Sequence, residues 1–194
     1  MQVFVSKFGR YLTLGATLVL VLALGTIAAS EGIQGVLVGI PSASLFVYSL
    51  VILFWLPRVE IDEGGVRLRN VIRTHYVSWG AIARIDTRWA LTLFTSDRKY
   101  TSWSATAPGR HAAIFASKDQ GEHLAESTYL AGTVRPGDLV TSDSGAAASV
   151  IRRIWESKRD QDLPAAVNTT WHTKTLIGFG LLLGLLTVFL QLNQ

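Results

Sequence analysis

Two long stretches of this chain carry almost no charge, and they lie on either side of a charged middle. Residues 11–57 contain a single Asp, Glu, Lys or Arg, which is Glu31, and residues 175–194 contain none. Charged residues make up 16% of the chain, against about 25% in a typical soluble domain. An uncharged helix of about 20 residues is long enough to cross the hydrocarbon core of a bilayer. The sequence therefore predicts membrane-spanning helices on both sides of a water-exposed region.

Three membrane-spanning helices are predicted, over residues 11–29, 36–56 and 175–190. The short link between the first two makes them an antiparallel transmembrane hairpin, so that residues 1–57 form one membrane region and residues 171–194 another. A secretory signal peptide is the alternative for the first helix, because basic residues precede its apolar run and small residues follow it. The length of that run, and the second apolar stretch behind it, favour a retained helix. Gly180 and Gly184 form a GxxxG pair in the third helix, a pattern that can bring helices close together.

The basic residues next to these helices predict the orientation. Cytoplasmic ends of membrane helices carry an excess of Lys and Arg. Lys7 and Arg10 precede the first helix, Arg58 follows the second and Lys174 precedes the third, whereas the segments at the other ends contain neither residue type. We therefore expect a multi-pass protein of the cell (plasma) membrane whose middle region is cytoplasmic.

The region from Arg58 to Ser104 is patterned as short β-strands. Apolar and polar residues alternate through it, and short turns separate about six segments, as in an antiparallel meander. The first turn is Asp62-Glu63-Gly64-Gly65, where the two glycines are expected to supply positive φ angles. Such a meander closes into a barrel or forms two packed sheets.

The last part of the middle region changes character. Residues 105–142 are rich in Gly, Pro, Ser and Ala and predict a long loop, with a possible short helix over Asp119–Ser127. Ser142-Asp143-Ser144 is typical of a helix N-cap. An amphipathic helix over residues 144–160 follows, with Ile151, Ile154 and Trp155 on its apolar side and Arg152 among the residues away from it.

A meander of short strands followed by one amphipathic helix resembles a pleckstrin-homology (PH)-like domain. The chain more specifically resembles the membrane-anchored, PH-domain-containing proteins of actinobacteria. The resemblance rests on the segments WLPRVEIDEGGVRLRN, RTHYVSWGAI, DTRWALTL, RKYTSWSATAPGR and RPGDLVTSDSGAAASVIRRIWESKRD. It implies that residues 58–162 form a partly open antiparallel β-barrel capped by a C-terminal helix. It implies no particular activity.

One departure from that resemblance concerns the ligand. PH domains that bind phosphoinositides carry a basic cluster around the first strand pair, whereas the first turn here is acidic and repels phosphate. The best basic feature is instead formed by Arg67, Arg69 and Arg73, of which the first two project from one strand face. These three arginines are candidate contacts for anionic lipid or a partner. The alternative is an ordinary solvated strand face.

Enzymatic signatures are missing from the sequence. There is no cysteine, so a thiolate nucleophile and Cys-ligated metal are excluded. The four histidines show no metal-binding spacing, and no nucleotide-binding loop or nucleophile elbow occurs. We therefore predict no catalytic, metal or cofactor site. The net charge of +4 is too small and dispersed to suggest nucleic acid.

The sequence thus predicts a membrane-anchored, non-catalytic PH-like module. Its expected partners are the bilayer together with a protein or further copies of the chain, bound through exposed strand edges or the long loop. The alternative function is sensing of anionic lipid by the basic strand face.

Overall fold

The computed structural model describes residues 1–107, 138–139 and 142–192, which divide into two compact units. One unit consists of residues 1–6 and 57–171, and the other of residues 7–56 and 172–194. The predicted helix over residues 119–127 lies outside the described residues, as does most of the predicted loop over residues 105–142.

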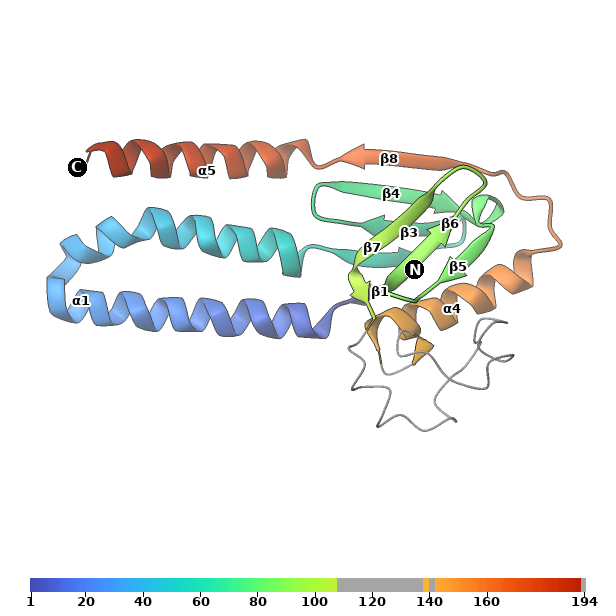
Figure 1. The fold of residues 1–194 in the computed structure, drawn as a ribbon, viewed down its shortest axis with the longest axis horizontal. Helices are drawn as coiled ribbons and strands as arrows, with labels where there is room; N and C mark the ends of the chain where they lie inside the picture. The colour runs from blue at the N-terminus through green and yellow to red at the C-terminus, as the bar shows by residue number, and fades with distance from the viewer. Residues whose placement is uncertain (108–137, 140–141, 193–194) are drawn as a thin grey trace. The chain divides into compact units, whose positions relative to one another are not determined.

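The described residues of the unit 1–6 and 57–171 form eight strands in two antiparallel sheets (Figure 1). The five-stranded sheet has the order β1-β2-β3-β4-β8, and the three-stranded sheet has the order β5-β6-β7. The strands are β1 (Gln2–Val5), β2 (Arg58–Ile61), β3 (Gly65–Arg69), β4 (Arg73–Ser78), β5 (Arg84–Asp86), β6 (Ala90–Phe94), β7 (Lys99–Thr106) and β8 (Val167–Trp171).

Strands β2 to β7 lie where the alternating pattern predicts them, but the predicted barrel is wrong. The sheets are separate because the chain leaves β4 through the 3-10 turn η2 (Trp79–Ala81), after which β5 pairs with β6 alone. Among the described residues, side-chain hydrogen bonds of Asn70 join the two sheets. Asn70, in the β3–β4 turn, donates to the Thr101 carbonyl and accepts from the Trp103 amide of β7, both at 2.8 Å.

Two strands lie in segments where the residue pattern predicts no strand. β1 precedes the first apolar helix and pairs with β2, and β8 precedes the last helix and pairs with β4. Both are edge strands of the five-stranded sheet. The residues that seemed to be mere links to the membrane segments are therefore part of the folded domain.

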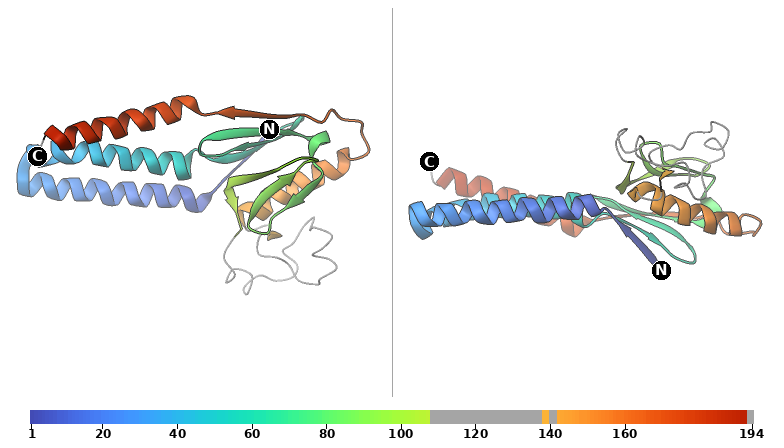
Figure 2. Two further views of the ribbon diagram at one scale, coloured as in Figure 1. Left: turned by 45° about the horizontal axis from the view of Figure 1, so that its top comes forward. Right: turned by 90° about the horizontal axis from the view of Figure 1, so that it is seen from below.

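Helix α4 (Asp143–Lys158) packs with the two sheets around one core (Figure 2). The Ser142 side chain accepts a hydrogen bond from the Gly145 amide at 2.9 Å, which is the geometry of an N-cap. Ala147, Ala148 and Ile151 are fully buried in the core, which also contains Leu68 of the five-stranded sheet. The buried apolar side chains of both sheets and of this helix form a single cluster.

One glycine of the β2–β3 turn has a specific role. Gly65 lies so close to β4 that an added Cβ would be 2.3 Å from the Val77 carbonyl oxygen. Gly64 and Gly65 do not supply the positive φ predicted for them, because among the described glycines only Gly32 has a positive φ, at 69°. Close packing, rather than a left-handed backbone, is what requires a glycine at position 65.

The second unit is helical. Helix α1 (Lys7–Leu50) leads into a π-helical turn, η1 (Val51–Trp55), and α5 (Thr173–Leu192) forms the C-terminal helix. Two helices, Lys7–Trp55 and Thr173–Leu192, are long and apolar enough to cross a membrane, judged by length and composition. The first of them contains both of the N-terminal spans predicted from the sequence.

Non-helical backbone at Gly32 interrupts α1, and the chain reverses its direction there (Figure 1). The Arg10 guanidinium lies 5.2 Å from the centre of the Trp55 ring, so the two ends of Lys7–Trp55 are close together. The Tyr48 hydroxyl donates to the Thr175 carbonyl at 3.2 Å, which ties α5 to the second part of α1.

The predicted GxxxG pair does not mediate this helix contact. An added Cβ on Gly180 or Gly184 would meet no atom within 4 Å. The close approach occurs at Gly178, where an added Cβ would lie 2.6 Å from the Tyr48 hydroxyl. Within the described residues, packing of α5 therefore depends on a different glycine from the predicted pair.

Candidate binding surface

Strand register separates the three predicted arginines. The core-facing residues of β3 and β4 pair as Val66 with Val77 and Leu68 with His75. Arg67 and Arg69 lie on the opposite, outer face of the sheet, because side chains alternate along a strand. Arg73 lies on the same face of β4 as His75 and Val77, but at the end of the strand, where it is exposed. The structure therefore brings two of the three arginines together on one face.

Arg67 is neutralised on that outer face. Its guanidinium lies 3.2 Å from the Glu60 carboxylate and 3.8 Å from that of Asp62, and it lies over the Tyr76 ring at 5.5 Å from the ring centre. A hollow of about 290 Å³ adjoins it, lined also by Tyr76 and Asn168. With two carboxylates as neighbours, Arg67 has little charge left for a ligand.

Glu60 is the buried acid that organises the face. It is 5% exposed and accepts from the Arg58 guanidinium at 2.5 Å as well as from Arg67. Burial raises the pKa of Glu60, but hydrogen bonds and charges from Arg58 and Arg67 outweigh burial and hold that pKa below its ordinary value. Glu60 is therefore ionised and shared between two arginines.

Arg69 has a different environment. It is directly opposite Arg58 in the β2–β3 ladder, so two like charges face each other across the strands. Within the described part of the chain its Nε is buried and has no hydrogen-bond partner, and no ion pair is formed by this arginine. Burial, followed by the charge of Arg58, lowers the pKa of Arg69, which Glu60 partly offsets. Arg69 is the surplus cation of the outer face.

Arg73 is associated with an aromatic side chain. Its guanidinium lies 5.6 Å from the ring centre of Trp171, its cross-strand partner on β8. Burial first, and then the charge of Arg73, lower the pKa of His75, whose Nδ1 lies 2.9 Å from the Thr169 hydroxyl. His75 is therefore neutral near pH 7 and serves as a core residue.

The chain passes between the two units at one end of the five-stranded sheet. β1 ends at Val5, β2 begins at Arg58 and β8 ends at Trp171, each within two residues of a helix of the second unit. Val5 pairs with Arg58, Arg58 with Arg69, and Arg73 with Trp171, so these residues occupy the same end of the sheet (Figure 1). We call this the exit end, defined by the strand ends at Val5, Arg58, Arg69, Arg73 and Trp171.

The opposite end, which we call the far end, carries the acidic β2–β3 turn. The Asp62 carboxylate accepts from the Gly64 and Gly65 amides at 2.9 Å, and Trp79 donates its indole N–H to the Glu63 carbonyl. A groove of about 490 Å³ lies nearby. Its lining comes from η2, the β6–β7 turn and the start of β8, and consists of Gly80, Ala81, Ile82, Ala83, Thr95, Ser96, Asp97, Arg98, Tyr100, Ala165 and Val167. The acidic β2–β3 turn therefore lies at the end of the five-stranded sheet opposite the chain exits.

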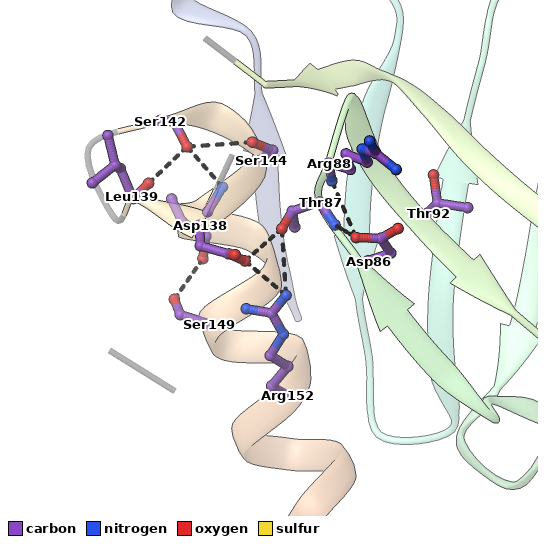
Figure 3. A network of polar contacts seen from close by, with 12 residues as sticks. Asp86, Thr87, Arg88, Thr92, Asp138, Leu139, Ser142, Ser144, Ser149 and Arg152 are labelled. Carbon is purple, nitrogen blue, oxygen red and sulfur yellow. Dashed lines mark hydrogen bonds and ion pairs between the residues drawn. The ribbon is translucent and has the colours of Figure 1, made fainter. Parts of the chain in front are cut away.

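A buried ion pair links α4 to the β5–β6 connection (Figure 3). Arg152 donates to the Asp138 carboxylate at 2.8 Å, and the Thr87 hydroxyl donates to the same carboxylate oxygen. All three residues are at most 5% exposed. The sequence places Arg152 away from the apolar side of the helix. Its burial became apparent only from the structure, because Asp138 lies outside the helix and Thr87 is 65 residues away in the sequence.

The described residues include no group of three or more His, Asp or Glu side chains arranged to hold a metal ion. His75 belongs to the core, and His172 lies at the start of α5. His111 and His123 are outside the described residues.

Residues 56–125 match the family model described as "Bacterial PH domain". This region of the chain is thus a PH-like domain with antiparallel sheets, the class of fold that generally binds lipids or proteins and is generally non-catalytic. The family model is bacterial without finer subdivision and covers neither of the two apolar helices. No curated protein and no solved structure matches the chain.

Proposed function

We propose that the chain is a membrane-anchored, non-catalytic binding module that presents its PH-like domain to a protein partner at the cytoplasmic face of the cell membrane. The observation that carries this proposal is the common exit end. All three connections to the apolar helices leave the five-stranded sheet there, which leaves the far end and its groove free for a soluble partner.

The apolar helices support three membrane crossings. Lys7–Trp55 has 49 residues and would be about 74 Å long as a single helix, more than twice the hydrocarbon thickness of about 30 Å. The reversal at Gly32 divides it into two parts, each of suitable length for one crossing, which supports the proposed transmembrane hairpin. Lys7, Arg58 and Lys174 then lie on one side, which favours a cytoplasmic domain.

Single-cysteine labelling tests the topology, because the natural chain has no cysteine. Ser30→Cys lies near the reversal and Ser96→Cys at the exposed β6–β7 turn. A membrane-impermeant maleimide should label Ser30→Cys in intact cells and Ser96→Cys only after the membrane is opened. Labelling of Ser96→Cys in intact cells would refute the proposed orientation.

Partner capture tests the binding role. A photo-reactive amino acid at Ser96, beside the far-end groove, should cross-link a defined protein in living cells. The matched control carries the same group at Arg153, an exposed position on α4. If neither position, nor affinity purification of the full chain from detergent, yields a specific partner, the protein-binding function fails.

A second candidate function is sensing of anionic lipid, and the observation that favours it is the surplus charge of Arg69. Of the three arginines predicted for this role, Arg67 is held by two carboxylates. Lipid sensing would therefore depend on Arg69 and Arg73 much more than on Arg67.

A further inference from the structure

The β3–β4 turn has an unusual composition for a turn exposed to water. The backbone N–H of Asn70 donates to the Arg73 carbonyl at 3.0 Å. This hydrogen bond closes the turn and leaves Val71 and Ile72 at its tip. Gly, Asn, Asp, Pro and Ser are the residues that favour such positions, and β-branched apolar residues are unfavourable there. Ile72 is nevertheless 41% exposed. An exposed position whose residue disagrees with the local turn preference is often a functional one.

This turn lies at the exit end of the sheet. Arg73 pairs with Trp171, and Trp171 is two residues before the first residue of α5. The tip of the turn therefore lies at the same end of the sheet as Trp171, the last residue of β8 before α5.

The exit end also has the chemistry of a membrane interface. Of its five strand ends, three are arginines and none is a carboxylate. Trp171 is 57% exposed, and Trp is enriched where proteins meet lipid headgroups. Arg69 faces Arg58 and has a buried Nε without a partner among the described residues. Arg58 is already paired with Glu60. A phosphate group beside the two arginines would therefore bind chiefly the partly exposed guanidinium of Arg69 and would relieve the like-charge repulsion.

The turn is also held firmly. The two hydrogen bonds between Asn70 and β7 fix its base to the second sheet. A rigid base allows the tip to be presented without a further loss of conformational entropy on contact with lipid.

We propose that the exit end is a contact surface for anionic phospholipid. The tip at Val71 and Ile72 enters the headgroup region beside Trp171, and Arg69, together with Arg58, binds a headgroup phosphate. This inference rests on the proposed membrane anchoring. It differs from lipid recognition through the β2–β3 turn, which is acidic and lies at the far end.

The test uses the full chain, reconstituted in vesicles, with a nitroxide label on a single cysteine. Ile72→Cys reports on the tip, and Glu63→Cys in the β2–β3 turn is the matched far-end control. In vesicles containing phosphatidylglycerol, the label at position 72 should be protected from a water-soluble nickel chelate and accessible to oxygen, whereas the label at position 63 should be open to the chelate. Equal accessibility of both labels to the chelate would overturn the proposal.

Charge variants test the phosphate site. Arg69→Gln is made in the Ile72→Cys background. In phosphatidylglycerol vesicles it should reduce about fivefold the ratio of chelate-protected to chelate-accessible label at position 72, because one basic residue near an anionic surface contributes about that factor. Arg69→Lys should restore most of the protection, and Arg98→Gln, which removes the same charge at the far end, should change nothing. If Arg69→Gln has no effect, or if pure phosphatidylcholine vesicles protect the tip equally well, the phosphate site is refuted.

These outcomes remain separate from those of the anchoring itself. Failure of the anchoring would appear as absence of Ser30→Cys labelling in intact cells, or as labelling of Ser96→Cys there. Failure of the present inference would appear as the expected labelling at both positions together with a chelate-accessible label at position 72.

Discussion

Removal of the Arg152 charge is expected to produce a large loss of stability. The Arg152 and Asp138 side chains are only 6% and 1% exposed, and they are 2.8 Å apart. Arg152→Met keeps the aliphatic stem but leaves the Asp138 carboxylate buried without this cation, while the hydrogen bond from the Thr87 hydroxyl remains (Figure 3). Leaving one charge of a buried pair without the other costs about 3–5 kcal/mol.

The assay is thermal unfolding of the full chain in detergent, followed by tryptophan fluorescence. For a chain of this size each kcal/mol lowers the unfolding midpoint by about 2–4 °C, so a decrease of roughly 6–20 °C is expected. Arg153→Met is the matched control, because Arg153 is the next residue on the same helix and is exposed. It should change the free energy of unfolding by at most about 0.5 kcal/mol.

A double variant tests whether the loss of stability comes from the unpaired charge or from the substitution at position 152 itself. Replacing both charges, as in Arg152→Met with Asp138→Leu, should recover much of the lost stability, because an apolar pair of similar volume is often as stable as a buried ion pair. The reasoning is wrong if Arg152→Met unfolds within about 1 kcal/mol of the natural chain, or if the double variant is less stable than both single variants.

Three further predictions concern packing and pH. Gly178→Leu should destabilise the packing of α5 by about 1–3 kcal/mol through overlap with Tyr48, while Gly184→Leu, which meets open space, should leave the unfolding midpoint of the purified chain unchanged. Gly65→Ala should lower the yield of folded protein, measured by size-exclusion chromatography, because its Cβ would overlap the backbone of the neighbouring strand. The pKa of His75 is lower in the folded chain than in the unfolded chain, so the unfolded chain takes up a proton first as pH falls. The stability that this residue contributes is therefore complete above pH 6.5 and is lost below it. Unfolding midpoints measured between pH 8 and pH 5.5 should show this loss, and His75→Gln should remove that part of the pH dependence.

The pattern of alternating residues was sufficient to predict β2 to β7, because side-chain alternation is a local property of a strand. It could not predict how the strands assemble. The choice between a barrel and two sheets depends on whether β4 and β5 pair, and the direction taken by the chain after Trp79 decides this. β1 and β8 were missed for a related reason. Each is a short segment beside an apolar helix, and its pairing partner lies more than 50 residues away.

The candidate site shows the same division. The sequence identified Arg67, Arg69 and Arg73 as a basic feature by residue type and spacing. The cross-strand neighbours then gave them different properties, since Glu60 and Asp62 neutralise Arg67, whereas Arg69 faces another arginine. The burial of Arg152 could not be predicted from the sequence either. An arginine on a helix is normally solvated, and its partner Asp138 could not be assigned from spacing.

By itself, the sequence determined the two apolar helices, the antiparallel strands between them and the helix that begins after Ser142, because hydrophobic periodicity and capping are written in neighbouring residues. Only the tertiary structure decided that three chain connections meet at one end of the five-stranded sheet and that the acidic turn lies at the other. The physical reason is strand register, which is fixed by hydrogen bonds and core packing between distant segments. Register also places Arg69, and the turn with Val71 and Ile72 that follows it, at the exit end of the sheet.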